Sequence, residues 1–303
     1  MKNIFFALAA VLVLGRAGGA DAAVQVVSTI TDFASIAQAV GGEDVHAVSL
    51  TPGSRDPHFA VAKPSMIRTV SRADLLLLIG ADMEIGWLPP LLRRGRNANI
   101  QLGTPGYLDL SMVIPLLEVP KVAVTRAMGD VHPKGNPHYW LDPRNGARIA
   151  RAIAGRLAEI DPAHADAYRQ RLNAFLQTLK TKYAGWRKQL APLRGRPVLA
   201  YHSSMAYLAS AFGFYIADEV EPKPGIAPSA SYLNQLLAKI RSEHIELLVM
   251  EPFYERRSGR FLHEKTGIHV VVIPQSVEAL PGINNYFDLF DGIVARITNA
   301  LGA

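Results

Sequence analysis

Three of the nine histidines lie at positions where α/β proteins place ligand-binding residues. His58 lies in the loop TPGSRDPHFA, after the strand pattern DVHAVSL, and His202 ends the strand pattern VLAYH. His138 lies in GNPHYWLDP, an irregular segment that leads into a helix start. Ligands of open α/β sheets bind at the carboxyl ends of strands, so these positions favour a functional role over packing. Three imidazoles from three separate segments predict a divalent metal site.

The other histidines are weaker candidates for metal ligands. His132, in GDVHPKGNPHYW, is expected to be an accessory ligand or a mobile recruiter of metal. The remaining five lie in patterns typical of surface or packing residues: His46, His164, His244, His263 and His269. The chain has no cysteine, so a metal ion would be held by imidazole, carboxylate or amide groups.

The elements that must position these histidines follow an alternating pattern. Short β-branched segments alternate with amphipathic ones after the N-terminus, and again after residue 197. This alternation predicts parallel strands crossed by helices. We therefore expect an α/β fold of two similar lobes with parallel sheets, residues 23–160 and 194–303, with the metal site between the lobes.

One long helix is expected to join the lobes, within residues 161–193. Asp142-Pro143 starts a helix that runs to about Ile160, and Asp161-Pro162 starts a second one that continues to about Leu190. Both starts place Asp at the N-cap and Pro at the first helical position, which is favourable there. The second helix is predicted to have about 30 residues and a length of about 45 Å.

Residues 1–22 have the pattern of a secretory signal peptide: a lysine, a short apolar segment and small residues around Ala22. The apolar segment falls short of the ~20 residues of a membrane span, which makes an uncleaved anchor the weaker alternative. We expect cleavage after Ala22 and a periplasmic protein. Without cysteine, no lipid anchor through that residue is expected.

The charge of the chain argues against a nucleic-acid partner. The formal net charge is +6, and the basic residues are dispersed without an aromatic-interleaved basic motif. The cluster Arg93, Arg94 and Arg96 is interpreted as the solvated end of a helix. A monomer is expected.

Three stretches of the chain resemble one known family, the cluster A-I solute-binding proteins that serve zinc and manganese ABC importers. They are RDPHFAVAKPSMIRTVSRADLLLLIGADME, NPHYWLDPRN and YHSSMAYLASAFGF. By this resemblance His58, His138 and His202 fall on the family's first three metal-ligand positions. The long helix resembles the family's rigid backbone between the lobes.

This resemblance implies a protein that captures a metal ion and hands it to the membrane permease of an ABC transporter. A periplasmic metallochaperone is a further expected partner. Because the lobes are joined by one continuous helix, we expect modest lobe movement and local rearrangement near His132 and His138.

The sequence departs from the family at the fourth ligand position. The family commonly has an aspartate after the last strand, whereas this chain has Gln275. A neutral amide oxygen is a weaker ligand than a carboxylate, so the position could be taken by Gln275, by water or by another acid. Glu251, which follows the strand pattern ELLVM, is the nearest alternative, as a ligand or as an acceptor that orients an imidazole.

The donor set favours Zn²⁺. Three imidazoles with at most one oxygen suit four-coordinate zinc, while Mn²⁺ prefers more carboxylate and a higher coordination number. The family's manganese-type members tend to have Glu at the third position, where this chain has His202. Cu²⁺ would bind three imidazoles at least as tightly, so a manganese or copper carrier remains an alternative.

Two other classes of function fit parts of the pattern. Three histidines with water are also the ligands of catalytic zinc, and Glu251 could serve as the general base of a hydrolase. The chain has no H-E-x-x-H motif, so we expect a protein that is not an enzyme. An adhesin or scaffold that contains a metal is the third reading.

Overall fold

The computed structural model describes residues 22–125, 128–129 and 131–302. The predicted signal peptide, apart from Ala22, lies outside the described residues. None of the helices in the described part of the chain has the length and hydropathy needed to cross a bilayer.

The first sheet has four parallel strands in the order β2-β1-β3-β4. Its register places Val26 of β1 opposite Ala47 of β2 and Leu75 of β3. All four leucines of β3 are buried, as expected for a central strand covered on both faces. The strands are β1 Val24–Ser28, β2 Val45–Ser49, β3 Leu75–Leu78 and β4 Tyr107–Asp109, and the accompanying helices are α1 Thr31–Gly41, α2 Pro64–Val70 and α3 Leu88–Gly95.

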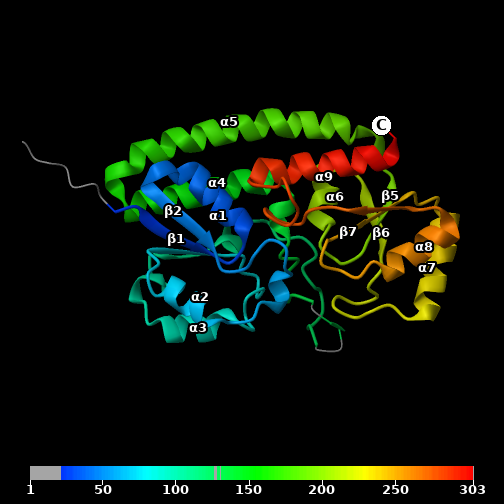
Figure 1. Ribbon diagram of the computed structural model, residues 1–303, viewed down its shortest axis with the longest axis horizontal. Coiled ribbons are helices and arrows are strands. Elements are labelled where there is room, and N and C mark those ends of the chain that lie inside the picture. The colour runs from blue at the N-terminus through cyan, green and yellow to red at the C-terminus, as the bar shows by residue number, and fades with distance from the viewer. Residues whose placement is uncertain (1–21, 126–127, 130, 303) are drawn as a thin grey trace, which may run out of the picture.

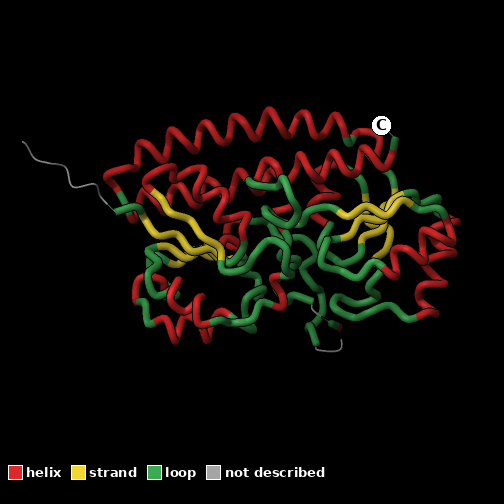
Figure 2. Tube along the Cα trace, in the orientation of Figure 1, coloured by secondary structure: helices red, strands yellow, loops and turns green. Residues whose placement is uncertain are grey.

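The second sheet repeats this arrangement with the order β6-β5-β7-β8, again parallel. Its strands are β5 Pro197–Ala200, β6 Tyr215–Glu219, β7 Leu247–Met250 and β8 His269–Val272, and its helices are α6 Ala206–Phe212, α7 Ala230–Ser242, α8 Arg257–Thr266 and α9 Tyr286–Leu301. Figure 2 shows the two sheets as separate groups of strands with helices and loops around them. The predicted fold class, two parallel-sheet α/β lobes, is confirmed.

In the chain, two consecutive helices connect the first sheet to the second, α4 Pro143–Ile160 and α5 Ala165–Gln189. The Asp142 carboxylate caps α4 by accepting from the N–H of Arg144, as predicted. Asp161 does not cap α5, because its carboxylate accepts from His164 and Tyr168 instead. A 3₁₀ turn, Pro162–His164, therefore precedes α5, which has 25 residues and not the predicted 30.

One hydrophobic core extends across both lobes. It includes Phe33 of α1, Trp186 of α5, Tyr207 of α6, Val249 of β7 and Phe290 of α9. Figure 1 shows α5 running along one side of the molecule over both lobes, and α5 contacts α1, α4 and α9. Burial of apolar surface thus holds the lobes to each other as well as stabilising each of them.

Candidate metal centre

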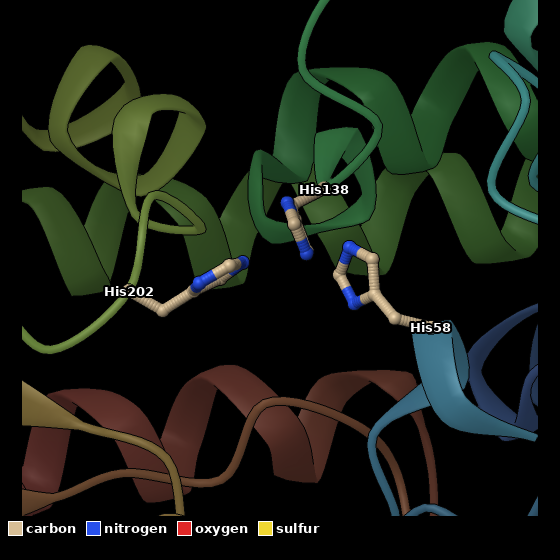
Figure 3. A group of neighbouring side chains, drawn as sticks. All are labelled: His58, His138 and His202. Carbon is tan, nitrogen blue, oxygen red and sulfur yellow. The ribbon is translucent and has the colours of Figure 1, made fainter. Parts of the chain in front are cut away.

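Three loops bring the predicted histidines together. His58 lies in the 3₁₀ turn Pro57–Phe59 beyond β2, His138 immediately precedes the 3₁₀ turn Tyr139–Leu141, and His202 lies two residues after β5. One nitrogen of each imidazole lies within 4.8 Å of the corresponding nitrogens of the other two. Figure 3 shows the three rings converging on one point from separate segments.

Each of the three imidazoles is oriented by a hydrogen bond to its Nδ1 atom. His58 Nδ1 lies 2.6 Å from Asp56 Oδ1, and His202 Nδ1 lies 2.8 Å from Glu221 Oε2. His138 Nδ1 lies 3.0 Å from Asn136 Oδ1. With Nδ1 as the donor in each pair, Nε2 is left as the metal-binding atom, an arrangement typical of ligating histidines.

Sequence reasoning missed these three orienting residues. Two of them had a local signal, because DPH and NPH both place a side-chain oxygen two residues before the histidine, where it also accepts the histidine's backbone N–H. Glu221 had no such signal. It lies nineteen residues after His202 and reaches it because β6 pairs with β5.

His138 is held as a neutral imidazole with an unused nitrogen. The residue is buried, with an exposed fraction of only 2%. Burial, followed by the nearby His58 and His202, holds the pKa of His138 well below its ordinary value. Within the described residues, His138 Nε2 has no hydrogen-bond partner. A buried acceptor without a partner is costly, and a metal ion would remove that cost.

His202 has the opposite electrostatic setting. Burial alone would lower the pKa of His202, but the hydrogen bond to Glu221 and the negative charge of Glu251 outweigh it and raise the pKa above its ordinary value. Asp56 shows the complementary effect: burial would raise the pKa of its carboxyl, but the hydrogen bonds and the positive charge of His58 together outweigh burial and lower it. The centre therefore combines an easily deprotonated imidazole with one that carries a proton more readily.

His132 lies at the edge of this group. Its Nε2 atom is 3.1 Å from Nε2 of His58, but it does not join the set of mutually close donor atoms. Burial, followed by the nearby His58, lowers the pKa of His132 to about 4. An ion pair of 3.0 Å between Lys134 and Asp82 ties the His132 loop to the first lobe.

The two oxygen candidates for the fourth position are both buried. Glu251 follows β7, and its Oε1 accepts from Ser204 Oγ, while its Oε2 lacks a partner among the described residues. Burial raises the pKa of Glu251 to about 7. Glu251 lies outside the group of close donors. Gln275 is held through its backbone oxygen, which accepts from Trp140 Nε1 at 2.8 Å, and ligation by its side chain stays a prediction.

Residues 26–300 match the family model described as zinc-uptake complex component A, periplasmic (ZnuA). This chain belongs to the ZnuA family. The family resemblance stated from the three sequence stretches is therefore confirmed.

Individual relatives agree with this assignment. The high-affinity zinc uptake system protein ZnuA of Brucella abortus is 28% identical over 165 residues, which are 54% of this chain and 48% of that protein, so this match spans about half of the relative. The metal ABC transporter substrate-binding lipoprotein FimA of Streptococcus parasanguinis is 25% identical over 262 residues, covering 84% of this chain and 81% of that protein. A solved ZnuA deletion mutant with zinc bound is 27% identical, with a TM-score of 0.77 over 92% of this chain and 98% of that one.

Proposed function

We propose that this protein captures a divalent transition metal ion with His58, His138 and His202, and that its physiological cargo is Zn²⁺ rather than Mn²⁺ or Cu²⁺. The observation that carries the proposal is the convergence of three imidazoles whose Nδ1 atoms are all engaged by oxygen acceptors. Three neutral nitrogen donors in a buried site suit tetrahedral zinc with one further ligand. The lobes that supply the donors are taken as residues 23–160 and 194–303, joined by residues 161–193.

His132 is proposed as an accessory ligand, because its Nε2 atom lies close to that of His58, although it does not join the group of three mutually close donors. Two ligand atoms at about 2.05 Å from a tetrahedral zinc ion lie about 3.3 Å apart. The separation of 3.1 Å between the Nε2 atoms of His58 and His132 fits such a pair. Gln275, Glu251 and water are the competing ligands, and each can be tested by substitution.

The captured metal is delivered to the membrane permease of an ABC transporter, in the periplasm. The names of the relatives support this role, because they describe components of metal uptake systems. The same names describe transport proteins and not enzymes. A periplasmic metallochaperone that supplies the metal is an additional partner in this proposal.

Metal analysis of protein purified without added metal tests the assignment, followed by competition among Zn²⁺, Mn²⁺ and Cu²⁺. One zinc ion per chain is expected, and His202→Ala should lose it. The matched control is His269→Ala, because His269 is exposed at the start of β8. Loss of zinc from the control, or retention by His202→Ala, would contradict the proposed ligands.

A test for hydrolase activity distinguishes a metal carrier from a zinc-dependent enzyme. A buried carboxylate with a pKa of about 7, Glu251, lies near His202 and has the properties of a general base. Zinc-loaded protein should nevertheless hydrolyse ester and phosphoester substrates no faster than the His202→Ala variant. Zinc-dependent turnover that Glu251→Gln abolishes would favour an enzyme.

A further inference from the structure

A pocket of about 290 Å³ reaches two of the three histidines of the centre, His138 and His202. His138 and His202, which are 2% and 3% exposed, line its inner part. Two carboxylates line it as well, those of Glu118, which is exposed, and Glu219, which is partly buried. His132 also lines the pocket. The pocket therefore contains two acidic side chains next to the proposed metal ligands.

Glu219 is the partly buried acidic residue of this pocket. Within the described residues, its carboxylate makes no hydrogen bond and no ion pair. Its acidic neighbours differ in this respect, since Asp218 pairs with Lys239 at 2.8 Å and Glu221 bonds to His202 at 2.8 Å. Burial, with the neighbouring acids adding to it, raises the pKa of Glu219 to about 7.

The fold places Glu219 close to the route that a metal ion would take. Glu219 ends β6 and is paired in register with Ala200, the last residue of β5. His202 follows only two residues later, so both side chains emerge at the same end of the sheet. The charge of His202 is among those that act on the Glu219 carboxyl.

Glu118 is connected to the centre through Asn136. Asn136 Nδ2 donates to Glu118 Oε2 at 2.8 Å and to the carbonyl oxygen of Ser203 at 2.6 Å. Its Oδ1 accepts from His138 Nδ1, as described above. The side chain that orients His138 thus also fixes the outer carboxylate.

The same pocket also reaches a histidine of the proposed centre whose unpartnered nitrogen would gain from a cation. His138 Nε2 is buried and unpartnered within the described residues, and His138 lines the pocket. An unpaired carboxylate and an unpaired imidazole nitrogen along one pocket both gain from a positive ion. Among the described residues that line it, none has a basic side chain apart from the histidines.

We propose that Glu219 and Glu118 form a capture site that takes a divalent metal ion from solvent and passes it to His138 and His202. This inference rests on the proposed function of the three-histidine centre. Carboxylate oxygens can replace part of the hydration shell while the ion is still outside, and their negative potential raises its local concentration. The imidazoles then replace the remaining ligands.

Rapid-mixing measurements of Zn²⁺ binding test the capture site in the full mature chain. Glu219→Gln keeps the shape of the side chain and should lower the association rate constant about tenfold. Because the capture site lies on the route in both directions, the dissociation rate constant should fall by a similar factor, and the Kd should change less than twofold. Glu219→Asp, which keeps the carboxylate, should recover most of the rate.

The matched control is Glu264→Gln, which removes the same charge from an exposed position on α8. It should leave both rate constants unchanged. Repeating the comparison in 0.5 M salt separates a local capture site from long-range attraction, because only the latter is strongly screened. Thermal melting of each variant verifies the fold.

Two results would overturn the capture site. One is an unchanged association rate constant in Glu219→Gln. The other is a Kd that rises because the dissociation rate constant increases, which would make Glu219 part of the final complex. Either result leaves the three-histidine proposal intact if the wild-type chain binds zinc tightly. Absence of tight zinc binding by the wild-type chain would instead overturn the proposed function.

Discussion

His202 is the histidine that makes metal binding sensitive to pH near neutrality. Its pKa lies above the ordinary value because Glu221 and Glu251 outweigh the effect of burial, whereas the pKa of His138 lies well below it. Once the pH falls below the raised pKa of His202, zinc must displace a proton from His202 but not from His138. The affinity for zinc is therefore highest above the raised pKa of His202 and decreases as the pH falls below it.

We expect zinc affinity to fall by about tenfold per pH unit once His202 is protonated, beginning above pH 6.5. Competition titrations between pH 5 and 8 measure the fall. Calorimetry in two buffers with different ionisation enthalpies should show proton release at pH values below the raised pKa of His202. An affinity that stays constant between pH 5 and 7.5 would mean that the histidines are not the ligands.

Gln275 gives a second prediction for a single residue. Gln275→Ala should weaken zinc binding by no more than about tenfold, or ~1.4 kcal/mol, because water or His132 can fill the position. His138→Ala should cost far more, and His132→Ala should lie between the two. Gln275→Asp should tighten binding of divalent ions, with a proportionally larger gain for Mn²⁺ than for Zn²⁺.

Titrations of these variants with both metals decide the ligand set. Loss of zinc binding in Gln275→Ala, together with its retention in His202→Ala, would show that the fourth position holds the metal.

The three histidines could be predicted from the sequence because each follows or precedes a recognisable element. Glu221 could not be predicted, because the contact depends on the pairing of two strands.

At the scale of elements, the start of α1 holds a segment of the second lobe. Thr31 Oγ1 donates to the carbonyl oxygen of Val277 at 2.6 Å, and Asp32 Oδ1 accepts from the N–H of the same residue at 3.1 Å. Trp140 Nε1 donates to the carbonyl oxygen of Gln275. The segment that follows β8 is therefore fixed by residues of the first lobe.

Thr31→Val should lower the free energy of unfolding by about 1–3 kcal/mol, because it leaves a buried carbonyl without its donor. Zinc affinity should change little, since none of the three histidines is touched. Urea unfolding of the metal-free protein measures the effect. Thr178→Val is the control, because Thr178 bonds only within α5 and is exposed. If Thr31→Val and Thr178→Val destabilise the protein equally, the hydrogen bond from Thr31 to Val277 does not stabilise the contact between the lobes.

The elements that the sequence predicted well are those with a strong hydrophobic pattern. The patterns VLAYH and ELLVM are rich in apolar side chains, and the structure has the largely buried strands β5 and β7 there. Strand β4 was missed because three residues are too few to form a pattern. The start of α5 was misplaced because Asp161 bonds to side chains and not to the helix N-terminus.

At the scale of the whole molecule, the lobes are less independent than the repeated strand order suggests. One buried cluster includes residues from both sheets and from the long helices, and hydrogen bonds add to it. Tyr286 Oη donates to the carbonyl oxygen of Trp140 at 2.6 Å, and Tyr207 Oη donates to that of Asn136 at 2.8 Å. The alternation of strand and helix patterns in the sequence indicated two lobes. A shared core depends on which helix faces pack against each other, and no local sequence pattern specifies that.

A shared core limits how far the lobes can move when metal binds. Opening them widely would expose apolar surface along α5 and α9, at a cost of roughly 25 cal/mol per Å². We therefore expect the radius of gyration from X-ray scattering to change by less than about 1 Å when zinc is added, as in complexes whose partners move little. Hydrogen exchange should slow mainly in residues 131–138 and around His58.

The His138→Ala variant with zinc is the control for non-specific effects of the metal. A decrease of several ångströms on zinc binding, absent from this variant, would instead indicate closure of the lobes about a hinge and would mean that the core seen between them forms only in the closed state.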